Sequence, residues 1–228
     1  MRTVTLASLK EQILQQANME ETQLIGDAEL VGYINSSIAE LHDILVQVYN
    51  GDYFQKDYSF TTVTNQDKYD LPADFYKLVG VDYVLGPRQI VVLNRFNFRD
   101  RFKDETFAFY SFQGFRTNIR YRLEKDSIRF NTVPDAGKSM RLWYIPCATK
   151  LVNDSDTYDG INGYEEYVIN DCVIKCLIKE ESDVSVQMAR KQAFIFRIQS
   201  AADNRDTAAP EVITDVYART GGNYGEDN

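Results

Sequence analysis

The sequence predicts an α+β protein in which helices from both ends of the chain form a bundle and flank a β-rich antiparallel insertion. Two observations indicate this: apolar residues recur at helical spacing near both ends, and the segments between residues 58 and 146 are short and rich in β-branched and aromatic residues. Hydrophobic residues are 44% and charged residues 26% of the 228 residues, which suits a globular protein with a proper core. We expect four parts: an N-terminal helical part (1–57), a β-rich insertion (58–147), a C-terminal helical part that packs with the first (148–205) and an extended tail (206–228).

Two helices are predicted in the first fifty residues. Leu6, Leu9, Ile13 and Leu14 recur at helical spacing, and either Thr5 or Ser8 is placed to cap the helix, with Glu11 positioned for a capping box. A second and longer helix is expected from Asp27, a natural N-cap, to about Asn50-Gly51. Its apolar stripe is the strongest secondary-structure signal in the chain and consists of Leu30, Ile34, Ile38, Leu41, Leu45 and Val48.

The middle of the chain has the pattern of antiparallel strands separated by turn residues. The predicted strand segments are YSFTTVT, YKLVGVDYVLG, RQIVVLN, NIRYRLEKDSIRFN and SMRLWYIP. Within the fourth, apolar and charged residues alternate before a turn at Lys125-Asp126, which predicts a hairpin. Pro134-Asp135-Ala136-Gly137 predicts the turn before the last strand.

Helical spacing returns after residue 163. One wide apolar face runs from Tyr164 to Leu177, and Ser182-Asp183 separates it from a second helix. The apolar stripe expected on that second helix is Val184, Met188, Phe194 or Ile195, Ile198 and Ala202.

The polar segment after residue 205 carries Pro210 and Gly221-Gly222 and is predicted to be an extended tail. It nevertheless contains the apolar, β-branched run EVITDVY, which a purely solvated terminus does not need. We therefore expect a strand or clip that docks onto another chain, with Pro210, Val212, Ile213, Asp215, Val216 and Tyr217 as the partner-binding residues.

The chain shows no recognisable set of catalytic or metal-binding residues. His42 is the only histidine and lies beside Leu41 on the long helix. We therefore expect its side chain to lie at the boundary between the apolar and polar faces of that helix. Cys172 and Cys176 fall on the apolar face of one helix without further ligands at matching spacing, which favours core packing of free thiols in a reducing cytoplasm. No phosphate-binding glycine loop, nucleophile elbow or HExxH sequence occurs. We predict no enzyme, no cofactor and no metal.

The acidic loop DSDTYDGINGYEE partly matches the calcium loop of an EF-hand. Asp154, Asp156 and Glu165 fit its first, third and twelfth positions, but Tyr158 occupies the fifth and Gly160 is one place late. An acidic loop near the N-terminus of the next helix, favoured by the helix dipole, is the preferred interpretation.

Arginines and phenylalanines alternate between Arg95 and Arg116. Such a pattern occurs in single-strand binding platforms, but Asp100, Asp104 and Glu105 cancel much of the charge. With a net charge of −9 the whole surface should repel phosphates, so a protein–protein contact surface is the favoured interpretation. No run reaches the ~20 apolar residues that span a bilayer, and no early segment has the pattern of a signal peptide.

The stretch Tyr-Asp-Leu-Pro-Ala-Asp-Phe contains two carboxylates that invite a catalytic interpretation. Pro72 fixes its own φ and biases Leu71 away from helix, so Asp70 or Asp74 is placed to cap a turn. Tyr69, Leu71 and Phe75 then supply apolar surface for packing. We interpret the motif Tyr69, Leu71, Pro72, Asp74 and Phe75 as framework.

This order of features resembles the head-to-tail adaptor, or connector, proteins of tailed bacteriophages. The likeness rests on Tyr69, Leu71, Pro72, Asp74 and Phe75, on a tail with Pro210, Val212, Asp215 and Val216, and on the helices before and after the β-rich middle. It covers most of the chain in order, although the β-rich middle carries no matching motif.

The resemblance implies a virion protein made in the bacterial cytoplasm and placed at the head-to-tail junction. It implies a homo-oligomeric ring, usually of twelve copies, below the portal protein, with the tail segment reaching the portal or a neighbouring subunit. Such a ring extends the channel through which double-stranded DNA is ejected without specific binding, and it offers a platform for a tail tube or nozzle protein. There are three alternatives. The first is a tail-tube or nozzle protein, and the second is a small metal-dependent hydrolase using Asp70, Asp74 or the 153–160 loop. The third is a host-directed binding module.

Overall fold

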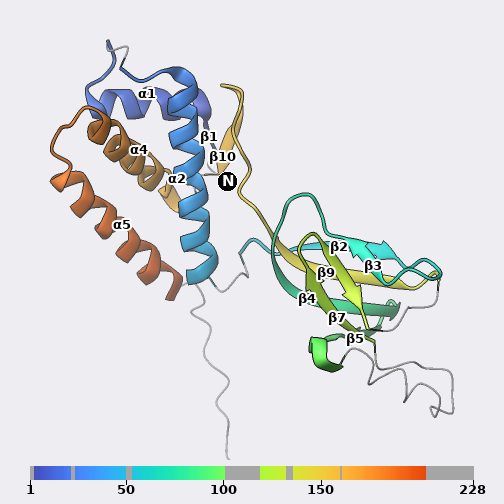
Figure 1. Cartoon of the computed structure of the whole chain (residues 1–228). Helices are drawn as coiled ribbons and strands as arrows, with labels where there is room; N and C mark the ends of the chain where they lie inside the picture. Colours follow the sequence, from blue (N-terminus) through green and yellow to red (C-terminus); the bar gives the residue numbers. More distant parts are fainter. Residues whose placement is uncertain are drawn as a thin grey trace, which may run out of the picture.

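The computed structural model describes residues 3–21, 24–49, 53–100, 119–131, 136–159 and 161–203. It is an α+β protein in which helices gather at one end and two sheets at the other (Figure 1). The helices are α1 (Leu6–Ala17), α2 (Asp27–Val48), α4 (Glu165–Lys179) and α5 (Ser185–Asp203), with 3-10 turns η1 (Phe98–Asp100) and η2 (Ile161–Gly163). The predicted tail and its six partner-binding residues lie outside the described residues, as do residues 101–118.

Within the described ranges, ten strands form three sheets. The strands are β1 (Thr3–Thr5), β2 (Lys56–Thr61), β3 (Lys68–Asp70), β4 (Phe75–Gly86), β5 (Gln89–Val92), β6 (Asn94–Arg95), β7 (Arg120–Glu124), β8 (Ser127–Phe130), β9 (Ser139–Pro146) and β10 (Thr157–Asp159). The sheet orders are β2-β9-β4-β5, β3-β8-β7-β6 and β1-β10. All neighbours are antiparallel except β6 and β7, which run parallel.

The predicted hairpin at Lys125-Asp126 is confirmed, since β7 and β8 pair across it from Tyr121–Phe130 to Glu124–Ser127. Lys125 takes a positive φ of 26° at this tight turn. β1, β3, β6 and β10 have two or three residues each and were not anticipated, because such short strands leave no periodicity in the sequence.

The ends of two helices differ in part from expectation. Thr5 is the cap of α1, because its side chain accepts a hydrogen bond from the backbone N–H of Ser8 at 3.2 Å. Asp27 was expected to be the N-cap of α2, but it is the first helical residue and Gly26 occupies the cap position without a side-chain bond. Asp27 instead adds its charge to the first turn, where the helix dipole favours it.

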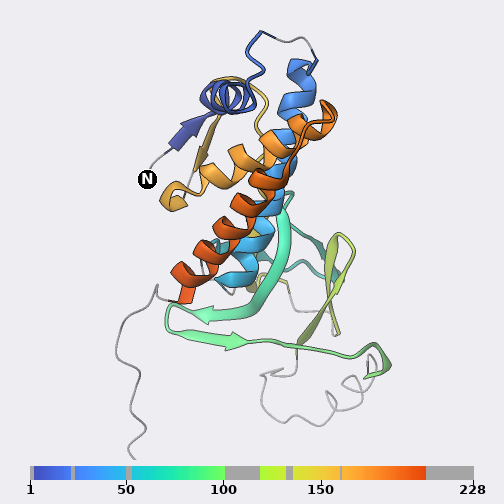
Figure 2. The ribbon, with the colours of Figure 1, turned by 90° about the vertical axis from the view of Figure 1, so that its left-hand side faces the viewer.

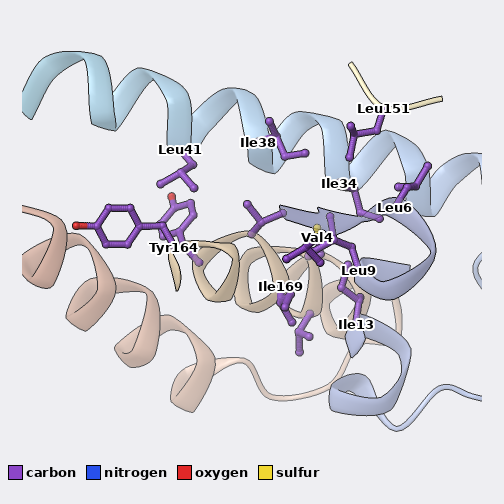
Figure 3. Packing of buried hydrophobic residues seen from close by; sticks show 14 of the residues in the cluster. Val4, Leu6, Leu9, Ile13, Ile34, Ile38, Leu41, Leu151, Tyr164 and Ile169 are labelled. Atoms are coloured by element: carbon purple, nitrogen blue, oxygen red, sulfur yellow. The ribbon is translucent and has the colours of Figure 1, made fainter. Parts of the chain in front are cut away.

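The helices share one hydrophobic core with residues from the second half of the chain (Figure 3). Leu6, Leu9 and Ile13 of α1, together with Ile34 and Leu41 of α2, pack against the buried face of α4. A second core lies between the two larger sheets and consists of Tyr69, Val81, Leu93, Ile119, Ile128, Phe130, Met140 and Leu142. The two clusters share no residue.

α4 and α5 confirm the two C-terminal helices. α4 is buried along most of its length, with Cys172 and Cys176 in the core. On α5, Ile198 is buried and Phe194 and Ile195 pack against the same core, but Met188, predicted in the inward stripe, is half exposed. The inward stripe of α5 is therefore narrower than its apolar content suggests.

Candidate functional site

The Tyr69–Phe75 motif holds a corner of the β-rich part together. The Tyr69 hydroxyl accepts a bond from the Val63 backbone N–H at 2.9 Å and donates to the Gln66 carbonyl at 3.1 Å. Leu71 packs against the core between the sheets, and the carbonyl of Pro72 accepts a bond from the N–H of Phe75 at 3.0 Å. These contacts close a turn before β4, which is what a framework role requires.

Asp74 is engaged by two side chains from neighbouring strands. Its carboxylate accepts a bond from the Tyr144 hydroxyl at 2.8 Å and pairs with the Lys56 ammonium at 3.2 Å. Burial alone raises the pKa of Asp74, but the Tyr144 bond and the Lys56 charge outweigh it and hold the pKa below its usual value. Burial and the same carboxylate raise the pKa of Tyr144 to about 12. Asp74 is thus a fixed anion that orders strands.

Asp70 and Phe75 complete the motif. Asp70 ends β3 with its side chain exposed, and the structure gives it no shared partner with Asp74. Phe75 is half-buried and stacks on the ring of Tyr144, with centroids 5.9 Å apart. Neither arrangement forms a carboxylate pair, and we keep the framework interpretation as our own.

His42 links the long helix to the end of β9. Its Nε2 is 2.9 Å from the carbonyl oxygen of Pro146, and its ring lies 4.7 Å from Phe54 and 5.7 Å from Tyr76. Burial lowers the pKa of His42, so the neutral imidazole donating to the carbonyl is favoured. A cavity of about 310 Å³ adjoins this histidine between α2 and residues 146–161. Its lining combines apolar side chains such as Leu45 and Phe54 with the polar groups of Lys56, Cys147 and Asp159.

Two carboxylates of the acidic loop, Asp154 and Asp156, bind other groups of the protein. Asp156 accepts bonds from the backbone N–H groups of Val152 and Asn153 at 2.8 and 2.9 Å, and Asp154 pairs with Lys10 at 2.7 Å. Glu165 lies apart, buried in the first turn of α4. Among the residues that the structure describes, no group of three His, Cys, Asp or Glu side chains is arranged to hold a metal ion.

The two helical cysteines sit in the core. Burial raises the pKa of Cys172 to about 12 and of Cys176 to about 11, so both stay protonated thiols. Cys147 is exposed.

A buried ionic cluster ties α2, α4 and α5 together, and sequence reasoning did not anticipate it. Asp171, only 3% exposed, accepts bonds from Ser37 at 2.6 Å, Lys175 at 2.8 Å and Lys191 at 2.7 Å. Lys191 also pairs with Glu40 at 2.7 Å. Since every charge in the cluster has a partner of opposite sign, it fixes the relative position of the three helices.

Two outward faces carry unusual apolar surface. The first is the outer side of the β2-β9-β4-β5 sheet, where Ile90 and Val92 of the edge strand β5 are 48% and 70% exposed. Beside them, Trp143 donates from Nε1 to Asp82 at 2.6 Å and lies 5.6 Å from the Arg141 guanidinium. The second is the outer side of α5, where Val186 and Phe196 are 66% and 73% exposed. Such surfaces are typical of contacts with other chains.

The predicted Arg/Phe stretch is described only up to residue 100. Phe96 is buried in its described part, whereas Phe98 is exposed and lies under the Arg122 guanidinium at 5.1 Å. The remaining arginines and phenylalanines of that stretch lie outside the described residues.

The described carboxylates of Asp74, Asp156 and Asp171 bind other groups of the protein, and apolar surface is exposed on β5 and α5. A family model described as SU10 adaptor protein matches residues 4–215 of the chain. The chain therefore belongs to the SU10 adaptor protein family, and it is a structural adaptor of bacteriophages and a virion component, as the resemblance in the sequence indicated. A search of curated proteins finds no match to the chain. No helix among the described residues has the length and hydropathy to cross a membrane.

Proposed function

We propose that the protein is a head-to-tail adaptor subunit that forms a ring of twelve copies directly below the portal protein. The ring extends the DNA channel and gives the tail tube or nozzle protein a platform on which to attach. The observation that carries the proposal is the family match over residues 4–215, nearly the whole chain. The exposed apolar faces on β5 and α5 support it, because a subunit of a ring needs contact surfaces on more than one side.

The C-terminal tail is proposed to join the ring to its partner. Residues 206–228 begin shortly after α5, which ends at Asp203. Pro210, Val212, Ile213, Asp215, Val216 and Tyr217 supply the apolar and β-branched side chains for a strand-like contact with the portal or a neighbouring subunit. These 23 residues reach up to about 80 Å when fully extended, enough to cross onto another chain.

Deletion of residues 206–228 tests this role. We expect the shortened chain to fold as before and to lose attachment to portal-containing heads, because it loses the docking segment and no part of the described cores. The measurement is sedimentation or negative-stain electron microscopy of heads mixed with each protein, with thermal melting as the folding control. Normal attachment of the shortened chain would refute the tail contact, and density for the full chain only farther down the tail would favour a tube or nozzle protein.

The same proposal implies a structural role that requires neither catalysis nor a bound metal ion. The acidic chain, with a net charge of −9, offers a channel wall over which DNA slides without specific binding. In the acidic loop, Asp156 binds backbone N–H groups and Asp154 pairs with Lys10, so we expect the melting temperature to be unchanged by a metal chelator. A large drop in the melting temperature on addition of chelator, measured by differential scanning fluorimetry, would support the alternative of a metal-dependent enzyme.

A further inference from the structure

Helix α5 carries a second apolar seam on the side turned away from the core. Val186, Ala189, Ala193 and Phe196 follow one another at spacings of three, four and three residues, and all four are exposed. This spacing places them in one line along the helix, about 15 Å long from first to last. The inner face is separately satisfied by Ile198, Phe194 and Ile195. Within the part of the chain that the structure describes, the outer seam is exposed and does not belong to the helical core.

The seam is bordered by positive charge in an acidic protein. α5 contains Arg190, Lys191 and Arg197 and no acidic residue before Asp203. Lys191 turns inward to Asp171 and Glu40, whereas Arg190 is exposed. Arg197 is also exposed, although its guanidinium lies 5.8 Å from the ring of Tyr164. A surface with an apolar centre and arginine at its border is the composition of a protein interface.

The opposite side of the helical part has the complementary character. Figure 1 shows α5 at the left of the helical part and β10 at its right, beyond α2; Figure 2, turned by 90°, shows α5 in front. Residues 151–159 contain three aspartates and no basic residue. Val152 in this segment is 72% exposed, and the Asp154 carboxylate remains largely exposed although it pairs with Lys10.

We propose that the α5 seam of one copy packs against residues 152–159 of the next copy, so that one face fills the other around the ring. The proposal rests on the ring proposed above and names its subunit interface. A closed ring requires two different, matching faces on opposite sides of each subunit. In this contact the exposed Val152 would meet the apolar seam, and the largely exposed Asp154 carboxylate would meet the arginine at its border. Contact between two α5 helices would instead bring Arg190 and Arg197 against their own copies.

Site-directed cross-linking on assembled heads tests the pairing. In a Cys147→Ser background, which removes the exposed native thiol, Val152→Cys and Phe196→Cys are combined in one chain and treated with a flexible bifunctional thiol reagent. We expect a ladder of covalent oligomers, because each chain links to two neighbours. The two single-cysteine chains are the matched controls and should give no ladder. Dimers from Phe196→Cys alone, or its capture of a portal or tail protein, would overturn the proposal.

Charge reversal gives an independent readout. Arg190→Glu should lower the fraction of subunits assembled at limiting protein by roughly fivefold or more, because it faces aspartates of the neighbour, and adding Asp154→Arg should restore part of the loss. Lys125→Glu, in the exposed turn between β7 and β8, is the control and should assemble normally. Rings that form without a ladder and ignore Arg190→Glu would refute this interface and leave the adaptor function standing. If the unaltered chain forms no ring on heads, the proposed ring fails and the interface fails with it.

Discussion

Asp171 is the residue on which the mutual position of three helices depends. It lies on α4 and binds Ser37 of α2 and Lys191 of α5, and Lys175 one turn along α4 gives it a second cation. Burial alone raises the pKa of Asp171, but the bonds from Lys175 and Lys191 outweigh it and hold the pKa below its usual value. Carboxylates of Asp171 and Glu40 likewise overcome the effect of burial on Lys191 and raise its pKa.

We predict that Asp171→Asn destabilises the protein by roughly 3 kcal/mol, at the lower end of the cost of breaking a buried ion pair, because Lys191 keeps Glu40. Urea unfolding followed by circular dichroism measures the change. Lys68→Ala, which removes a surface pair with Glu124, is the control and should cost less than about 1 kcal/mol. Equal effects of the two substitutions would show that the Asp171 cluster adds nothing beyond surface charge.

The same cluster predicts a pH dependence. A carboxyl whose folded pKa is lowered stabilises the fold above its unfolded pKa of about 3.9, and this contribution is lost as pH falls through the folded value. The difference in unfolding free energy between the unaltered chain and Asp171→Asn should therefore be constant above about pH 5 and shrink below pH 4. A difference that stays constant down to pH 2 would contradict the lowered pKa.

At the scale of elements, α1 begins where β1 ends. Thr5 is the last residue of β1 and the cap of α1, so its extended backbone pairs with Thr157 while its hydroxyl accepts the Ser8 N–H. The N–H groups of Leu6 and Ala7 are bonded to the carbonyls of Asp156 and Asp154. The start of the helix is thereby anchored to the segment that precedes α4.

Thr5→Ala should lower the free energy of unfolding by about 1 kcal/mol through loss of the cap, and Thr5→Ser should restore most of it. Ser8, the other cap suggested by the sequence, accepts only the side chain of Gln12, so Ser8→Ala is expected to cost less. Chemical denaturation of the three variants ranks them. A larger loss for Ser8→Ala than for Thr5→Ala would assign the cap to Ser8.

The long periodic elements were predictable, and contacts between distant segments were not. The apolar stripe of α2 runs at helical spacing from Leu30 to Val48, and β9 is an uninterrupted run of strand-forming residues. For these two elements the local sequence pattern was enough to predict the secondary structure. β1 and β10 have three residues each and exist because Thr3–Thr5 meets a partner more than 150 residues away. In the sequence, Asp171 is a polar residue beside an apolar stripe. Its ion pairs with Lys175 and Lys191 become apparent only in the folded structure. The sequence analysis predicted one apolar stripe on α5 and did not identify the outer seam, which becomes apparent only when the exposure of the side chains is known.

On the scale of the whole molecule, one hydrophobic core is built from both ends of the chain and the other from its middle. The core of the helices draws on residues 4–49 and 151–198, whereas the core between the sheets lies within residues 69–142. The chain leaves the helical part before β2 and returns after β9. These strands are antiparallel neighbours, and Lys56 is paired with Tyr144 in their register. Both crossings of the chain therefore occur at one place, beside His42 and Pro146.

We propose from this that the helical part folds without the insertion, and that a short Gly-Ser linker in place of residues 57–143 will be tolerated. Cα atoms of paired residues on antiparallel strands lie about 4.5–5.5 Å apart, a gap that two or three linker residues span without strain. The shortened chain should be helical by circular dichroism and unfold in one cooperative transition, because its core keeps every buried residue, although loss of the Tyr76–Asp43 bond will lower its stability somewhat. A matched chain with Ile34→Asp in the same background should not fold, which controls for helicity without a core. If the shortened chain itself is unfolded or melts without cooperativity, the helices depend on the sheets and the protein is a single folding unit.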